Sequence, residues 1–69
     1  MQSKEETVKG TVIEAMPNTL FRVLVGGEKE VISYLSGKMR MHKIRVLVGD
    51  TVEILEEPYG GKARIVKRL

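Results

Sequence analysis

Residues 36–45 form a basic segment that reads Ser-Gly-Lys-Met-Arg-Met-His-Lys-Ile-Arg. It holds four cations and no acid within eight residues, namely Lys38, Arg40, Lys43 and Arg45. Like charges this close repel one another and destabilise a compact state, so their presence favours a polyanion as partner. Runs typical of β-strands flank the segment on both sides, which indicates an insertion between two strands.

Five short runs rich in β-branched and aliphatic residues, separated by turn signals, predict five β-strands. We expect these strands at residues 7–15, 20–25, 31–35, 51–55 and 63–66. Alternation along the second run places Phe21, Val23 and Val25 on one face. In the fourth run we expect Val52 and Ile54 to point inward. No segment shows a long apolar period of 3.6 residues, so the basic segment holds the one candidate helix.

That helix is expected to be short and to begin near Ser36, whose hydroxyl suits a cap. Lys38 and Arg40 then lie in its first turn, where the helix dipole disfavours cations. This conflict indicates that the two residues serve a ligand and not the stability of the helix. Gly10 predicts a bulge or bend in the first strand, as small barrels require. The predicted fold is all-β, a five-stranded Greek-key OB-fold barrel with a short helix between strands 3 and 4. An SH3-like barrel is the alternative.

Positive charge is concentrated in two places along the chain. Residues 38–45 and residues 62–69 together hold 8 of the 12 Lys and Arg and none of the 9 acids. The remaining residues therefore have a net charge of −5. The second basic segment contributes Lys62, Arg64, Lys67 and Arg68. Such segregation is the electrostatic footprint of a nucleic-acid-binding protein, whereas a merely solvated surface mixes signs.

Length and composition bound the remaining expectations. A chain of 69 residues fits one domain, which we divide into a flexible N-terminal tail at 1–6 and a single OB-fold RNA-binding domain at 7–69. The absence of cysteine excludes disulfides and thiolate metal sites, and no apolar run is long enough to span a bilayer. The polar N-terminus is no signal peptide. We therefore expect a cytoplasmic protein, a monomer with no cofactor.

Several motifs resemble bacterial translation initiation factor one. They are Met-Pro-Asn-Thr-Leu-Phe-Arg-Val at 16–23, Leu-Ser-Gly-Lys-Met-Arg at 35–40, Ile-Arg-Val at 44–46, Gly-Asp at 49–50, Pro-Tyr at 58–59 and Arg-Ile-Val at 64–66. The resemblance covers nearly the whole chain and implies an OB-fold that binds the small ribosomal subunit at the aminoacyl-tRNA site. It implies contacts with ribosomal RNA and a neighbouring ribosomal protein, and cooperation with the other two initiation factors.

The resemblance also implies that residues 38–42 enter the minor groove of a ribosomal RNA helix, and that Arg22, Arg64 and Arg68 line the RNA-facing side. The predicted RNA-binding residues are Arg22, Lys38, Met39, Arg40, Met41, His42, Lys43, Arg45, Tyr59, Arg64 and Arg68. One of the two methionines is expected in the core and the other in contact with RNA. Tyr34 stands where the family commonly has histidine, and the loop at Gly60-Gly61-Lys62 is shorter than usual.

Other functions remain as alternatives. A cold-shock-like RNA chaperone would display several aromatics on adjacent strands, whereas this chain has only three, of which Phe21 is expected in the core. A protein-interaction barrel with a basic patch is the third hypothesis. Nothing brings His42 and Asp50 together with a serine, so the sequence predicts no catalytic site, and a lone histidine without cysteine predicts no metal site.

Overall fold

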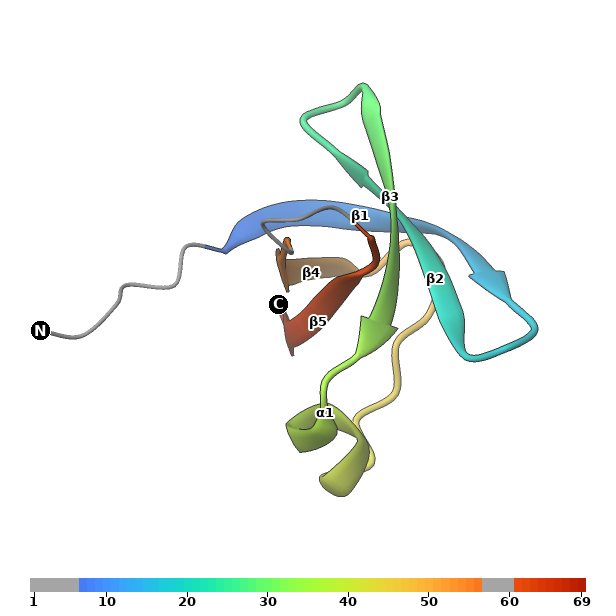
Figure 1. Cartoon of the computed structure of the whole chain (residues 1–69), viewed down its shortest axis with the longest axis vertical. Helices are drawn as coiled ribbons and strands as arrows, with labels where there is room; N and C mark the ends of the chain where they lie inside the picture. The colour runs from blue at the N-terminus through green and yellow to red at the C-terminus, as the bar shows by residue number, and fades with distance from the viewer. Residues whose placement is uncertain (1–6, 57–60) are drawn as a thin grey trace, which may run out of the picture.

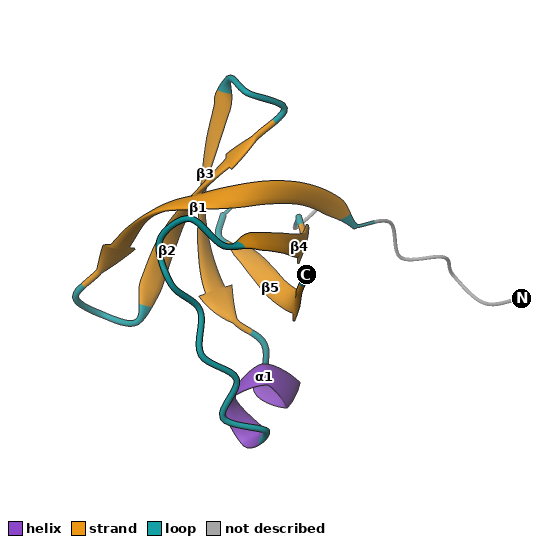
Figure 2. Cartoon of the chain, turned by 180° about the vertical axis from the view of Figure 1, so that it is seen from behind, coloured by secondary structure: helices purple, strands orange, loops and turns teal. Residues whose placement is uncertain are grey.

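The computed structural model describes residues 7–56 and 61–69, and these form a closed barrel of five strands with one short helix (Figure 1). The strands are β1 (Val8–Met16), β2 (Leu20–Val25), β3 (Lys29–Leu35), β4 (Thr51–Leu55) and β5 (Ala63–Arg68), and the helix is α1 (Gly37–Met41). Around the barrel the order is β1-β2-β3-β5-β4. Only the β3–β5 pair is parallel. The predicted fold class is confirmed, with the helix between β3 and β4 (Figure 2).

Two strands, β2 and β4, have the predicted bounds, and the other three are shifted or longer. β1 begins and ends one residue later than predicted. β3 begins two residues early because Lys29 and Glu30 continue the ladder with β2 beyond the barrel wall. β5 continues to Arg68, since Lys67 pairs with Glu53 and Arg68 with Val52 on β4. Polar residues extend both strands because their side chains face solvent there.

Gly10 is the point at which β1 joins two neighbours, because it pairs with Val25 of β2 and with Val52 of β4. A Cβ atom at Gly10 would lie 2.5 Å from Val23 Cγ1 and 2.9 Å from the Leu24 carbonyl oxygen. The glycine therefore serves close approach of the backbones. The register irregularity of β1 lies between Val12 and Glu14, so the bulge predicted at Gly10 is not there. The other part of the prediction, a first strand that serves two neighbours at its middle, agrees with the pairing of Gly10.

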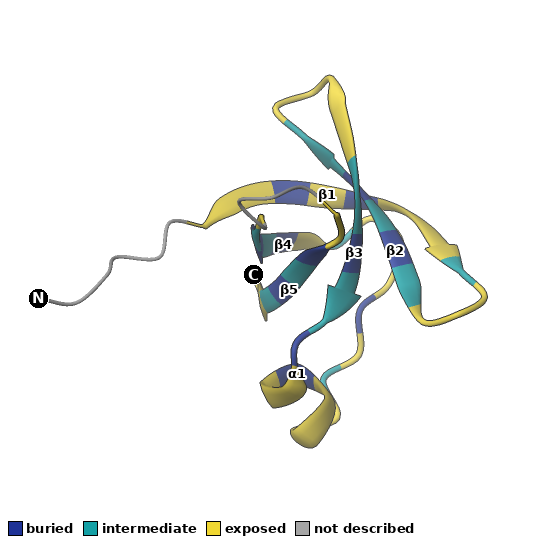
Figure 3. Cartoon of the chain, in the orientation of Figure 1, coloured by how far each residue is buried: buried dark blue, intermediate teal, exposed yellow. Residues whose placement is uncertain are grey.

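The core runs through the middle of the barrel and continues under α1 (Figure 3). Its members are Val12, Phe21, Val23, Met39, Val46, Val52, Ile54, Ala63 and Ile65. The inward positions predicted on β2 and β4 are confirmed for Phe21, Val23, Val52 and Ile54, while Val25 is only partly buried against the core. No helix in the described part of the chain is long and apolar enough to cross a membrane.

The two glycines Gly10 and Gly37 give a matched test of this packing. Gly10→Ala should lower the free energy of unfolding by about 1–3 kcal/mol, because its methyl group overlaps Val23 and the Leu24 backbone. Gly37→Ala places its methyl group in open space inside a helix and should leave stability unchanged or raise it by up to about 1 kcal/mol. Urea unfolding of both variants measures the difference, and equal midpoints would contradict the assigned close approach.

Candidate nucleic-acid interface

Helix α1 is fixed to the end of the barrel through Ser36. Its hydroxyl accepts a hydrogen bond from the Met39 backbone N–H at 3.2 Å, which confirms the predicted cap. The Ser36 N–H donates to the carbonyl oxygen of Ile65 at 3.0 Å, so the cap is itself tied to β5. A five-residue helix is too short to be stable in isolation, and this double attachment holds it in place.

The two methionines of α1 have different environments. Met39 is 2% exposed and belongs to the core cluster, whereas Met41 is 76% exposed. The alternative left open by the sequence is thereby resolved. Met39 is withdrawn from the candidate RNA contacts because nearly all of its surface is buried in the core, and Met41 remains among them.

After α1 the chain turns back sharply onto the barrel. Lys43 has a φ of 54°, a left-handed conformation that non-glycine residues seldom adopt. The N–H of Ile44 donates to the Met39 carbonyl oxygen at 3.0 Å, which returns the chain to the core after the turn. Arg45 then meets the second basic segment, since Arg68 Nη1 donates to its carbonyl oxygen at 2.9 Å. This hydrogen bond brings the end of the second basic segment against the first.

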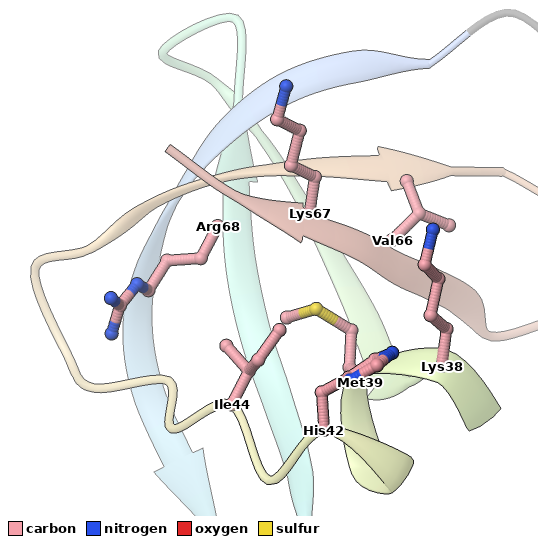
Figure 4. Close-up of a pocket in the computed structure, with 7 residues that line it drawn as sticks. All are labelled: Lys38, Met39, His42, Ile44, Val66, Lys67 and Arg68. Carbon is pink, nitrogen blue, oxygen red and sulfur yellow. The ribbon is translucent and has the colours of Figure 1, made fainter.

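A hollow of about 460 Å³ lies between α1 and the end of β5 (Figure 4). Its lining residues are Lys38, Met39, His42, Ile44, Val66, Lys67 and Arg68. Met39 and Ile44 point toward each other at its centre, while the charged ends of Lys38 and Lys67 point the same way in this view and that of Arg68 points to another side. The three charged ends stand apart, so they suit separate phosphates along a backbone better than one bound anion.

We use the name α1–β5 face for the basic residues of α1, of the turn that follows it and of the end of β5, together with Met41 and His42: Lys38, Arg40, Met41, His42, Lys43, Arg45, Lys67 and Arg68. All eight are exposed. Among residues 7–56 and 61–69, the ion pairs are Arg22 with Glu14, Arg22 with Glu30, and Lys29 with Glu56. No carboxylate of those ranges thus neutralises the cations of residues 38–45.

Arg22, predicted for the same RNA-facing side, lies apart from this face on β2. Its Nε is 2.9 Å from Glu14 Oε1, and its Nη1 is 3.1 Å from Glu30 Oε1. These hydrogen bonds, with Glu30 first and Glu14 second, raise the pKa of the guanidinium above its ordinary value. Arg22 is therefore a permanent cation held by two carboxylates.

The remaining predicted residues have separate positions. Arg64 is half-buried on β5, beside Tyr34 in the parallel register with β3. Tyr59 lies outside the described residues, as does Gly60 of the loop that is predicted to be short. Ile44, Val66 and Lys67 line the hollow although they were not predicted as site residues. Lys67 could have been predicted from the sequence, because it lies in the acid-free segment 62–69. Ile44 and Val66 could be assigned to the hollow only from the packing of α1 on β5.

The described residues contain no group of three His, Cys, Asp or Glu side chains able to hold a metal ion. The chemistry of the α1–β5 face is therefore that of ammonium, guanidinium and imidazole groups around an apolar floor. Such groups neutralise phosphates, and arginine also donates two hydrogen bonds at once.

Comparison with known protein families agrees with the resemblance found in the sequence. The family model of translation initiation factor 1A / IF-1 matches residues 1–69. The chain belongs to this family. Membership of the IF-1 family assigns it a role in translation initiation.

Solved structures support the assignment and the fold. The solution structure of translation initiation factor one from the Wolbachia endosymbiont strain TRS of Brugia malayi is 37% identical, with a TM-score of 0.79, covering 93% of this chain and 77% of that one. YjeQ from Thermotoga maritima is 25% identical with a TM-score of 0.78. YloQ, a circularly permuted GTPase, is 24% identical with a TM-score of 0.81. Each of these two matches covers 93% of this chain and 23% of the other, so the likeness concerns only part of those proteins.

Truncation of the two methionines of this IF-1 family member should change its stability by very different amounts. Met39→Ala should destabilise the protein by about 2–5 kcal/mol, as expected for truncation of a large buried side chain. Met41→Ala should change the free energy of unfolding by less than about 0.5 kcal/mol, because its side chain is exposed. Denaturant midpoints of the two variants test this, and a strong loss from Met41→Ala would overturn the assigned positions.

Proposed function

We propose that this initiation factor binds the small ribosomal subunit at the aminoacyl-tRNA site through ribosomal RNA. It also contacts a neighbouring ribosomal protein there and supports assembly of the initiation complex with the other two initiation factors. The protein acts as a monomer in the cytoplasm, by occupying a site and not by catalysis. The observation that carries the proposal is the family match over residues 1–69.

The geometry of the α1–β5 face supports this function. Helix α1 lies at one end of the molecule, and the tip of the β2–β3 hairpin lies at the other (Figure 1). A compact basic element of this kind fits the minor groove of an RNA helix, which is wide and shallow. Lys38 and Arg40 then reach phosphates on either side, while Met41 packs against sugars or bases. His42, Lys43, Arg45 and Arg68 extend the same contact toward β5.

The cold-shock-like alternative has less support. Its mode of binding stacks successive bases on several exposed aromatic rings. Among the described residues, Phe21 is buried at 9% exposure and Tyr34 is half-buried. A single partly accessible ring within the described part of the chain is a poor stacking platform, so recognition through phosphate and groove shape fits better.

The test replaces two cations of α1. Lys38→Ala/Arg40→Ala should weaken binding to purified small subunits at least about tenfold, because charge-assisted hydrogen bonds contribute about 1.5–3 kcal/mol each. The denaturant midpoint of this variant should hardly move, because both residues are exposed and their replacement should change the free energy of unfolding by less than about 0.5 kcal/mol. Binding is measured by co-sedimentation over a range of protein concentrations.

Lys9→Ala/Lys29→Ala is the matched control, because it removes the same charge away from the α1–β5 face. Lys29 makes only an exposed ion pair with Glu56 at 3.5 Å, which contributes little to stability. Its affinity for the subunit should stay close to that of the unmodified protein. Equal losses from the two double variants would show that net charge alone matters and would reject the α1–β5 face as the binding site.

Salt provides an independent check on the phosphate contacts. The affinity for the subunit should fall on a log–log plot against salt concentration with a slope of about −0.7 to −0.9 for each phosphate neutralised. Lys38→Ala/Arg40→Ala should make that slope shallower by one to two such units. An affinity that does not respond to salt would instead favour the protein-interaction alternative.

A further inference from the structure

The guanidinium of Arg22 is occupied from two sides on the outer surface of the barrel. Its Nε bonds Glu14 of β1 at 2.9 Å, and its Nη1 bonds Glu30 of β3 at 3.1 Å. The side chains of Arg22, Glu14 and Glu30 are 34%, 55% and 49% exposed, so all three are accessible to a ligand. Two carboxylates thus engage two of the guanidinium nitrogens, Nε and Nη1, that phosphate oxygens could otherwise use.

A β-bulge in β1 is what brings Glu14 to this position. Val12 is buried and pairs with Val23, and simple alternation would then turn Glu14 inward, opposite Phe21. The ladder instead pairs Glu14 with Arg22, with Ile13 as the extra residue. Both Ile13 and Glu14 are exposed as a result. The bulge re-aims one carboxylate onto the arginine, which is a known use of such irregularities.

Glu30 reaches the same arginine along a diagonal of the β2–β3 ladder. Arg22 pairs directly with Ile32, and Glu30 lies two residues away on the same face of β3. A long side chain bridges this diagonal separation. Two independent features of the sheet, a bulge and a diagonal pair, therefore place carboxylates on one guanidinium.

The surface concerned is the one that OB-folds use to bind oligonucleotides, the face of strands two and three. Here its partly buried apolar and aromatic residues, Leu20, Leu24, Ile32 and Tyr34, would suit the bases of a single strand. The charged cluster on the same face does not suit a phosphate, because Glu14, Arg22 and Glu30 together carry a net negative charge.

We propose that Glu14 and Glu30 determine specificity by holding Arg22 and keeping single-stranded nucleic acids off the outer face of β1–β3. This role is the opposite of the RNA contact predicted for Arg22 from the sequence, and it rests on the function proposed above, in which the α1–β5 face binds RNA. A phosphate approaching Arg22 must displace two carboxylates and meets their repulsion. The paired cation therefore stays on the sheet surface without recruiting unstructured RNA.

The experiment measures binding of a 3′-labelled oligouridylate of about twelve residues, a length within the range that single OB-folds occupy, at low salt by fluorescence anisotropy. Glu14→Gln/Glu30→Gln retains side chains of the same size that still accept hydrogen bonds, so we expect the fold to persist, which thermal unfolding checks. The variant should bind the oligonucleotide at least about fivefold more tightly. Its salt dependence should steepen by about 0.7, the contribution of one further phosphate on a single strand.

Two controls separate this explanation from a change in net charge. Glu28→Gln removes one charge from the same hairpin, but Glu28 makes no ion pair among residues 7–56 and 61–69, so its effect should stay below twofold and below that of Glu30→Gln. Adding Arg22→Gln to the double variant should abolish the gain. No gain in the double variant, a gain that survives without Arg22, or equal gains from Glu28→Gln and Glu30→Gln would each overturn the proposal.

The outcome is distinguishable from failure of the proposed function. If the unmodified protein did not bind small subunits, the ribosomal role would fall while the oligonucleotide comparison could still be read. If subunit binding held but the double variant gained nothing, only the specificity role of Glu14 and Glu30 would fall. Should the double variant unfold, Glu30→Gln alone tests the idea, with an expected gain of about twofold over Glu28→Gln.

Discussion

Met39 joins helix α1 to the hydrophobic core, and the basic surface of the protein depends on that attachment. The helix has five residues, and the last three carry Met39, an exposed arginine and an exposed methionine. Burial of one side chain, with the Ser36 cap tied to β5, fixes the orientation of the others. Repulsion among the neighbouring cations is then offset by packing, and the charges can be presented to a partner without local order being lost.

The cations of the barrel differ in whether a carboxylate pairs with them. Lys38, Arg40, Lys43 and Arg45 have no carboxylate partner among the described residues, whereas Arg22 has two. Surface ion pairs contribute little to stability, so the difference concerns ligands more than folding. In the proposed function the α1–β5 face binds phosphates, whereas on the face that related barrels use for single strands Glu14 and Glu30 pair with Arg22.

The sequence predicted the strands with alternating aliphatic residues well, because β2 and β4 each have one buried face. It missed the extensions of β3 and β5, where polar residues continue the ladder without any hydrophobic signal. It associated irregularity with Gly10, whereas the bulge lies at Ile13, a residue with ordinary strand propensity. Only the register reveals that shift, because the pairing partner decides which residue is extra.

The candidate site was predictable as a region but not residue by residue. Four cations without an acid identified α1 and its following turn, and the resemblance named the family that the comparison then confirmed. Five helical residues give too little periodicity to decide between Met39 and Met41. The capture of Arg22 by Glu14 and Glu30 depends on contacts between three strands, which spacing along the chain does not show.

The most direct measurement of the central claim is cleavage of ribosomal RNA by hydroxyl radicals released from a tethered iron chelate. The chain has no cysteine, so Leu69→Cys and Glu28→Cys each create a single attachment site. Leu69 is 50% exposed and follows Arg68 of the α1–β5 face, while Glu28 lies in the β2–β3 turn. The account predicts strong cleavage near the aminoacyl-tRNA site from position 69 and weak cleavage from position 28. Strong cleavage from position 28 with none from position 69 would contradict it.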